Sequence, residues 1–272
     1  MYKHKLYLIE NKTALHVGSG DNNFGIIDKQ IQRDAITKYP TIHSSSLKGA
    51  LKEYCSYRHN EEDSKNFLAY IFGDEDSSGK VRFIDAHLLS VPMRADINPY
   101  YHCVSPQSIQ NFLEFCETFG INIDNKDDLT KVANSNEKRI LVKEGTPTIE
   151  DEEAQSSNSY NFNALEKLVG SPVALVPNSI FEEFMHNLPV VARNQLENGE
   201  SKNLFYEEIL PRQSKFFTVI SEPTYLHPSD EKKLTNAFER FNNYLTDANT
   251  IHIGANASIG YGVSIFKEIG NA

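Results

Sequence analysis

The stretch from Leu15 to Glu53 decides how the rest of the chain is interpreted: LHVGSGDNNFGIIDKQIQRDAITKYPTIHSSSLKGALKE. It predicts a strand followed by a helix, joined by a connection far longer than such connections need. Long connections without structure of their own are often functional. Gly18 and Gly20 open the connection, and glycine lets a ligand approach the backbone closely. Three serines at positions 44–46 close it as candidate N-caps of the helix.

The start of the predicted helix has the properties of a phosphate site. Free backbone N–H groups and a partial positive charge attract anions there, and Lys48 adds a cation just inside the helix. Asp28, Arg33 and Asp34 lie in the connection, between the glycines and the serines. A surface loop that leads into a capped helix would show the same pattern, so this stretch alone does not separate a structural role from a functional one.

The composition is that of a globular protein. A chain of 272 residues fits one large domain or two small ones, and 39% hydrophobic with 24% charged residues is ordinary for a folded core. No apolar run approaches the length of a membrane span, and the N-terminal residues alternate as a strand does instead of forming a cleavable signal. We therefore expect a cytoplasmic protein with no membrane partner.

Three cysteines, Cys55, Cys103 and Cys116, are too few and too widely spaced for a disulfide framework. They are odd in number and have no C-x-x-C spacing, so a zinc cluster is not indicated either. We expect reduced thiols in the core.

The formal net charge of -10 argues at first sight against a nucleic-acid partner, because phosphate binding draws on a basic surface. Net charge is a sum over the whole surface, and a local basic track can coexist with acidic faces. An isolated copy of this chain should therefore bind RNA only weakly.

The first half of the chain predicts alternating strands and helices. Alternating hydrophobicity predicts a strand from Lys5 to Val17, and a 3.6-residue period predicts a helix from the serines to about Tyr54. A short helix ending at Gly73, a strand at Lys80–Val91 and a helix spanning Ser105–Gly120 follow. Residues 121–162 are mostly polar and predict a peripheral, partly flexible insertion with one strand at 139–142.

The second half repeats this order. Asn198–Gly199, between two strand-like runs, predicts a β-hairpin that we place at residues 190–212 and call the thumb. The other expected elements are strands at 173–176, 215–220, 251–253 and 263–266, a helix through Phe181 and Leu188, and a helix capped by Ser229 that carries Leu234, Ala237, Phe238, Phe241 and Leu245. The order predicts one α+β domain over residues 1–272, with a core of ferredoxin or RNA-recognition-motif type and large insertions.

Three separated stretches carry a resemblance to a known family. They are HVGSG with GIIDKQIQRD and SSLKGALK, the segment ending LFYEEILP, and IHIGANASIGYG. Together they resemble the RAMP superfamily of CRISPR proteins, and within it the backbone subunits of type III-B Cmr effector complexes. The chain departs from the family pattern at His43, Ile209 and Ala255, which affects the expected local loop geometry.

The resemblance implies an RNA-guided ribonuclease that works as a polymer. Copies would stack head to tail along a CRISPR RNA with other Cmr subunits, and each thumb would interrupt the guide–target duplex at regular intervals. Such a contact between copies does not close on itself and produces a helical filament.

The resemblance also implies the site residues. Asp28 matches the family's catalytic aspartate, where it would take a proton from a 2′-OH of single-stranded target RNA or ligate a metal, and His16 and Glu207 match supporting positions. The sequence shows no compact metal cage, so we expect a divalent ion, Mg²⁺ or Mn²⁺, held loosely and partly by RNA phosphates. Structural roles remain open: Asp28 capping a turn, His16 packing a strand end and Glu207 on a solvated thumb edge.

We expect guide RNA to be bound through its backbone and sugars rather than its base edges. The candidate residues are those of the helix start and the glycine-rich turn: Arg33, Ser45, Ser46, Lys48, Gly254, Asn256, Gly260 and Gly262. Arg193, Lys202 and Arg212 are candidate thumb contacts. Two alternatives stay open, a scaffold of the same complex without catalysis and a metal-free endoribonuclease that processes guide RNA as a monomer.

Overall fold

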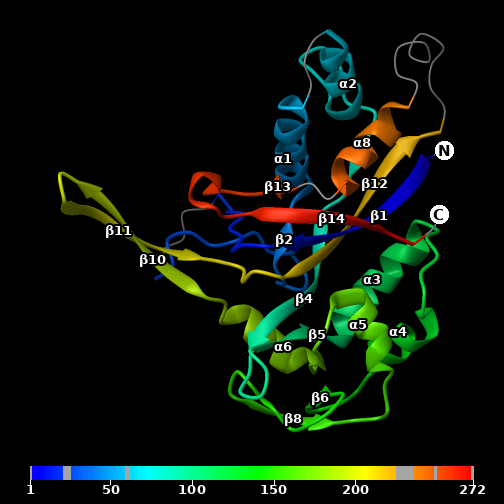
Figure 1. The fold of residues 1–272 in the computed structure, drawn as a ribbon, viewed down its shortest axis with the longest axis vertical. Helices are drawn as coiled ribbons and strands as arrows, with labels where there is room; N and C mark the ends of the chain where they lie inside the picture. The colour runs from blue at the N-terminus through cyan, green and yellow to red at the C-terminus, as the bar shows by residue number, and fades with distance from the viewer. Residues whose placement is uncertain (1, 21–25, 59–61, 225–235, 248–249, 271–272) are drawn as a thin grey trace.

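The computed structural model describes residues 2–20, 26–58, 62–224, 236–247 and 250–270. A mixed sheet runs through the molecule (Figure 1). Its central strand β1 (Tyr2–Asn11) lies between β12 (Lys215–Pro223) and β14 (Val263–Ile269) and is antiparallel to both.

The sheet continues on both sides of these three strands. β13 (Ile251–His252) pairs with β14, and β4 (Ala86–Arg94) pairs with β12. β5 (Tyr100–Val104) follows β4, and β9 (Val173–Leu175) runs parallel to β5. Two short strands lie off this path: β2 (Thr41–Ile42) beside β4 and β3 (Arg82–Phe83) beside β12.

Helices cover both faces of the sheet, because its central strand is apolar on both faces. Tyr7 and Ile9 of β1 face one core, while Leu6 and Leu8 face the other. The first core is covered by α1 (Ser44–Ser56), α2 (Glu62–Phe72), α6 (Asn178–His186) and α8 (Ala237–Thr246). The second is covered by α3 (Pro106–Thr118), α4 (Lys126–Ala133) and α5 (Phe162–Val169).

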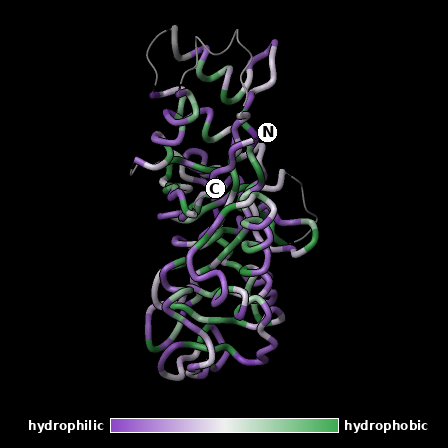
Figure 2. Tube along the Cα trace, turned by 90° about the vertical axis from the view of Figure 1, so that its right-hand side faces the viewer, coloured by the Kyte–Doolittle hydropathy of each residue, from purple (hydrophilic) through white to green (hydrophobic). Residues whose placement is uncertain are grey.

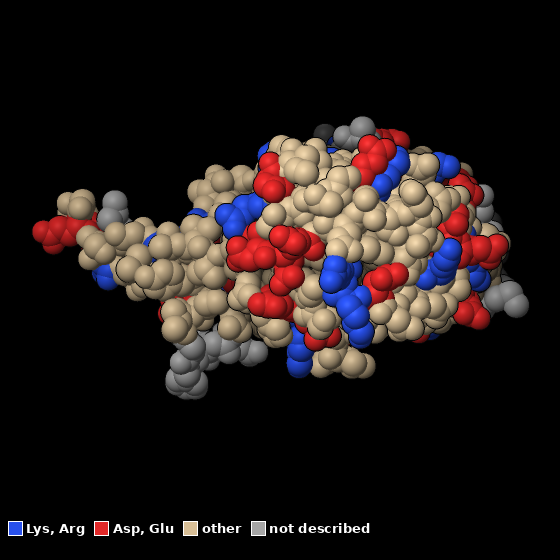
Figure 3. Space-filling model, turned by 90° about the horizontal axis from the view of Figure 1, so that it is seen from below, with Lys and Arg blue, Asp and Glu red and all other residues tan. Residues whose placement is uncertain are grey.

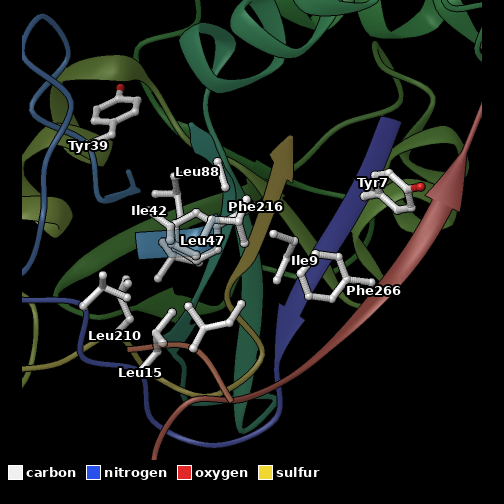
Figure 4. Close-up of a cluster of buried hydrophobic side chains, with 14 of the residues drawn as sticks. Tyr7, Ile9, Leu15, Tyr39, Ile42, Leu47, Leu88, Leu210, Phe216 and Phe266 are labelled. Carbon is white, nitrogen blue, oxygen red and sulfur yellow. The ribbon is translucent and has the colours of Figure 1, made fainter. Parts of the chain in front are cut away.

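The predicted fold class, α+β with a ferredoxin-like core and large insertions, is confirmed by this arrangement. In the first core Leu47 of α1 packs among strand residues that include Phe216 and Ile42, and Leu15 and Leu210 close it at one end (Figure 4). Short apolar and polar stretches alternate along the whole height of the body (Figure 2). The three cysteines are free and buried, as expected.

The insertion at 121–162 is richer in structure than the sequence predicted. Besides the expected strand, β6 (Ile140–Val142), it contains α4, β7 (Thr148–Ile149) and β8 (Glu152–Ser156). α4 forms because Leu129 and Val132 pack into the second core. This end of the molecule carries an acidic run at 150–153, and acidic side chains gather on its surface towards the thumb (Figure 3).

The thumb is a two-stranded hairpin, β10 (Val190–Glu197) and β11 (Glu200–Glu208), that projects from the body (Figure 1). Its turn is Asn198–Gly199, with φ of 55° and 86°, which is the backbone that favours these two residues in a tight hairpin. The predicted hairpin is confirmed, although its second strand ends at Glu208, before Arg212.

Two predicted boundaries are wrong for identifiable reasons. The first strand ends at Asn11 rather than Val17, because the buried Asn11 side chain donates to the carbonyls of Thr13 at 2.7 Å and Pro211 at 2.9 Å and so turns the chain. The serines do not cap α1: Ser44 is already helical, and its N–H donates instead to Asp85 Oδ1 at 2.7 Å.

Other boundaries shift less. The expected strand at 80–91 divides into β3 and β4. Ser229 and Leu234 lie outside the described residues, but α8 buries Ala237, Phe238, Phe241 and Leu245 as predicted. None of the helices in the described ranges has both the length and the apolar character needed to cross a bilayer.

The buried His102 on β5 should make stability depend on pH. Burial lowers the pKa of His102 from 6.5 to about 4. The nearby charge of Lys215 lowers this pKa further, while Glu10 raises it by a smaller amount. Between these values the unfolded chain binds a proton that the folded chain does not, so the free energy of unfolding falls as pH is lowered. The contribution lost at pH 5 is about 2 kcal/mol.

Urea unfolding of the His102→Gln variant at pH 7 and pH 5 tests this expectation. The variant should lose clearly less stability between the two pH values than the wild type, while the exposed His186→Gln control should behave as the wild type. An unchanged pH dependence in His102→Gln would assign the effect to other groups.

Candidate functional site

The long connection after β1 and the thumb meet at the base of the hairpin. Lys29 N donates to the carbonyl of Tyr206 at 3.0 Å, and Glu208 N donates to the carbonyl of Lys29 at 2.9 Å. The connection therefore lies parallel to β11 as a one-residue extension of the thumb sheet. This contact brings sequence positions 28 and 207 together.

Asp28 is held at this junction but remains accessible. Its Oδ2 accepts a hydrogen bond from the N–H of Tyr206 at 2.7 Å, and the residue is exposed. Among the described residues none bonds to Oδ1. The backbone of the thumb thus fixes the position of a carboxylate that still faces solvent.

Glu207 lies beneath the surface in a cluster of four side chains. It is 1% exposed, and its carboxylate accepts from Arg193 Nε at 2.5 Å and from Asn256 Nδ2 at 3.0 and 3.1 Å. His16 Nε2 lies 3.7 Å from Oε1. The alternative that Glu207 lies on a solvated thumb edge is therefore wrong, because β11 runs into the body at this point.

Glu208 is buried beside it and holds the connection. Its carboxylate forms an ion pair with Arg33 and accepts from Ile31 N at 3.1 Å. Its carbonyl accepts from His16 Nδ1 at 2.7 Å. Because a carbonyl oxygen can only accept, Nδ1 of His16 carries a proton, and Nε2 is the atom that faces Glu207.

The glycine-rich turn closes over these residues from the other side. Ala255 N donates to the carbonyl of His16 at 2.9 Å, and a Cβ at Gly254 would lie 2.3 Å from that same oxygen. Gly262, with φ of 73°, would place a Cβ 2.0 Å from the carbonyl oxygen of Ile253. Both positions therefore need glycine, and the turn is fixed against the first part of the connection at His16.

Arg193 connects the thumb to this turn. Its guanidinium lies over the ring of Tyr261, 4.7 Å from the centroid, while its Nε binds Glu207. The Nη2 atom of Arg193 is buried and has no hydrogen-bond partner in the described part of the chain. Arg193 and Arg33 were predicted to contact guide RNA, which stays a prediction; in the structure each binds a buried glutamate.

Gln32 organises the start of α1, although it was not among the predicted site residues. Its Nε2 donates to the carbonyl of Gly18 at 3.1 Å and to Ser46 Oγ at 2.9 Å, and its Oε1 accepts from His43 N at 2.8 Å. It is buried. The pattern I-Q-R-D, in which apolar Ile31 precedes a glutamine, gave no sign that the amide points inward.

The predicted residues thus separate into two groups. His16, Glu207, Arg193, Asn256 and Gly254 are in one cluster at the base of the thumb, with Asp28 above it. Ser45 and Lys48 lie on α1, where Lys48 lines an open hollow of about 450 Å³ together with Lys52 and the acidic loop 74–76.

The two remaining thumb candidates are placed differently. Lys202 forms an exposed ion pair with Glu197 near the hairpin tip. Arg212 is exposed and lies beyond the hairpin.

The described residues do not assemble a resident metal site. Among them no group of three or more histidines, cysteines, aspartates and glutamates could hold an ion. At the base of the thumb, Glu207 and Glu208 already accept hydrogen bonds in a buried setting, which leaves the exposed Asp28 as a single donor. The expected Mg²⁺ or Mn²⁺ therefore does not fit a site built by this chain alone.

Comparison with known proteins places this site in a family context. The family model of the RAMP superfamily matches residues 8–266. The chain belongs to the RAMP superfamily. This confirms the family that the three sequence stretches indicated.

One relative matches nearly the full length of this RAMP protein, and another matches a third of it. It is 25% identical to the "CRISPR system Cmr endoribonuclease Cmr4" of Pyrococcus furiosus, over 98% of this chain and 97% of the relative. A shorter match, 32% identical over 34% of this chain and 30% of the relative, is the "CRISPR system CMR subunit Cmr4" of Saccharolobus solfataricus.

Solved structures share the fold. The oligomeric Cmr4 of Pyrococcus furiosus has a TM-score of 0.72 at 22% identity, over 98% of both chains. A chain of the type III-B Cmr-beta complex bound to cognate target RNA has a TM-score of 0.77 at 20% identity, over 97% of this chain and 96% of that one.

The Glu208 cluster should be necessary for holding the connection on the thumb. Glu208→Ala would leave Arg33 and the N–H of Ile31 without their buried partner, so the free energy of unfolding should fall by about 3 kcal/mol or more. The amide of Ile31 should also exchange with solvent faster in hydrogen-exchange measurements. Glu200→Ala, an exposed change near the tip of the same hairpin, is the matched control, and a Glu208→Ala protein as protected at Ile31 as this control would contradict the assignment.

Proposed function

We propose that this RAMP protein is the backbone subunit of a type III-B CRISPR effector complex, where it binds CRISPR RNA and cleaves complementary target RNA in antiviral defence. The observation that carries the proposal is the position of Asp28: an accessible carboxylate fixed by the thumb backbone, in a chain related over its full length to a Cmr endoribonuclease.

Asp28 is suited to start cleavage of an RNA strand held against the thumb. Its free Oδ1 would take the proton of a target 2′-OH, and the resulting oxygen would attack the adjacent phosphorus. The P–O5′ bond would break, which gives a 2′,3′-cyclic phosphate and a 5′-OH that takes its proton from water. The buried Glu207 and His16 would act through position, by holding the thumb strand and the first part of the connection near Asp28.

Repeated copies would place one such carboxylate at each step along the guide. Beyond its base the thumb projects away from the body, as an element that contacts a neighbouring copy and its RNA would do (Figure 1). The oligomeric state of the similar Pyrococcus furiosus Cmr4 supports association between copies, and the Cmr-beta complex with target RNA supports RNA and further Cmr subunits as partners.

Guide RNA would follow the start of α1 and the glycine-rich turn. Gln32 holds the start of α1 against the connection by donating to Ser46 Oγ and to the carbonyl of Gly18. Lys48 would contribute charge, and Gly260 and Asn256 lie in the turn with φ of 85° and 67°. An acidic chain would then bind RNA mainly where neighbouring copies share the path.

The alternative of a scaffold without catalysis differs from this proposal only in that Asp28 would have no catalytic role. A guide-processing enzyme that uses histidine chemistry fits less well, because His16 is 3% exposed and both its ring nitrogens face glutamates.

Replacing Asp28 should separate cutting from binding. Asp28→Asn keeps an oxygen for the N–H of Tyr206 and removes the base, so we expect cleavage of target RNA to fall by about a hundredfold or more. Target binding and stability should stay near wild type, because an exposed carboxylate is worth under about 1 kcal/mol. Asp28→Ala should give the same loss, and Asp151→Ala is the charge-matched control.

Cleavage and binding are measured on the same assembled complexes. Cleavage at the wild-type rate in Asp28→Asn would favour the scaffold alternative. Loss of both target binding and cleavage would show that Asp28 has a structural role in the connection.

Lys48 should contribute to guide binding. Lys48→Ala removes a cation from the helix start, so the amount of RNA that copurifies with the complex should fall and the dependence of log affinity on log salt should become shallower by about one unit. Lys138→Ala, an exposed lysine on the insertion, should leave both quantities unchanged. Equal RNA content in the two variants would argue against this role.

A divalent metal requirement would be a property of the protein–RNA complex rather than of the chain. We expect EDTA to stop cleavage by the assembled complex and added Mg²⁺ or Mn²⁺ to restore it, while the isolated chain shows no change in melting temperature with either ion, because it lacks a preformed donor set. Full cleavage in EDTA would remove the metal from the proposal.

A further inference from the structure

A second polar cavity lies on the opposite face of the sheet from α1. It has a volume of about 380 Å³ and is bounded by the C-terminal end of α5 and by strands β1, β5, β12 and β14. Its chemistry comes from six residues: Glu10, His102, Glu166, Lys167, Lys215 and Lys267. We call it the lysine pocket.

Two groups of the pocket wall are buried and close together. His102 is 3% exposed and Lys215 is 9% exposed. A Cβ placed at Gly170 would lie 3.2 Å from His102 Nε2 and 3.7 Å from Lys215 Nζ. Gly170, with φ of 90°, therefore places no side chain against these two nitrogens.

Among the described residues Nδ1 of His102 makes no hydrogen bond, and Lys215 makes only a long ion pair with Glu10. Nδ1 of His102 is buried without a partner among the described residues. Nζ of Lys215 lies 3.7 Å from Glu10 Oε2, which is longer than a hydrogen bond. Buried polar groups without partners are rare in folded proteins, and a missing ligand is one reason for them.

The pocket carries a surplus of positive charge although the whole chain carries -10. Its three lysines face two glutamates, and both glutamates also have partners at the rim. Glu10 binds Lys12 at 2.5 Å, and Glu166 binds Ser171 at 2.9 Å and Lys143 at 3.4 Å. The carbonyls at the end of α5 add about half a negative charge, which does not cancel the surplus.

The pKa shifts of His102 and Lys215 also indicate that the pocket would favour an anion. Burial lowers the pKa of both His102 and Lys215, and the positive charge of Lys215 disfavours a second one on His102. An anion in the pocket would stabilise the charged form of each. Several convergent cationic donors in a concave site suit a phosphate group better than a singly charged carboxylate.

We propose that the lysine pocket binds a phosphate group, held by Lys215 and Lys267 with His102 as an additional donor. The phosphate comes either from a small molecule or from an RNA backbone. The site is separate from the base of the thumb, since Glu10 and Lys215 lie on the second-core face of β1 and β12 while Leu15 and Leu210 close the first core.

The test is titration of the full-length chain with inorganic phosphate at constant ionic strength, followed by calorimetry. Lys215→Gln should weaken binding by about tenfold, the cost of a charge-assisted contact. The exposed Lys267→Gln should weaken it several-fold without affecting folding, so the test does not depend on the buried variant. Lys138→Gln carries the same charge change outside the pocket and should bind as the wild type.

A second measurement reports on His102 itself. Proton NMR of the histidine ring should show the pKa of His102 rise when phosphate is added to the wild type, and not in Lys267→Gln at the same concentration. Equal phosphate affinity in wild type, Lys215→Gln and Lys267→Gln would overturn the proposal. A pKa of His102 that does not change when phosphate is added would also overturn it.

The source of the phosphate is decided with a short single-stranded RNA. If the RNA competes with phosphate and both pocket variants bind it more weakly than Lys138→Gln does, the pocket holds an RNA backbone phosphate. If the RNA binds all variants equally while phosphate binding is lost, the occupant is a small phosphate. Neither result depends on cleavage at Asp28.

Discussion

The structure depends on two adjacent buried glutamates where the thumb enters the body. Glu207 gathers Arg193, Asn256 and His16, while Glu208 holds Arg33 and the backbone of Ile31. Two uncompensated carboxylates at this depth would be strongly destabilising, so the surrounding cations and amides are a condition of folding. Because those partners come from the glycine-rich turn, from two separate parts of the long connection and from the other strand of the thumb, one cluster joins the thumb, the connection and the turn.

This constraint explains how an exposed catalytic candidate can be well positioned. Asp28 is exposed and is placed by the N–H of Tyr206, the residue directly before Glu207. The buried contacts of Glu207 and Glu208 fix the position of the thumb strand next to Asp28. The Asp28 carboxylate therefore stays accessible to a substrate. The sheet beneath provides rigidity, since the apolar faces of β1 hold a core on each side.

Local patterns in the sequence were enough to predict much of the fold. Asn198–Gly199 located the hairpin turn, Ser105 and Pro106 located the start of α3, and the period of Phe238, Phe241 and Leu245 located α8. The misses involve contacts between distant segments. Asp85 bonds the start of α1 where serines were expected to cap it, and α4 is stabilised by packing that its polar surroundings concealed.

The same limit applies to the site. Family motifs identified His16, Asp28 and Glu207, but adjacent glutamates in a hairpin resemble a solvated edge until the partners of each are known. The role of Gln32 could not be predicted from the sequence, because its side chain binds three groups that are spread from Gly18 to Ser46.

If Asp28 is the general base, each copy of this chain presents one catalytic carboxylate to the target strand. The most direct test maps the cut positions on a target RNA labelled at its 5′ end, in complexes assembled from wild-type chain mixed with increasing fractions of Asp28→Asn chain. We expect evenly spaced cuts, all of which weaken in proportion to the variant fraction while their positions stay fixed. A single cut, or evenly spaced cuts whose intensity does not change with that fraction, would rule out this role of Asp28.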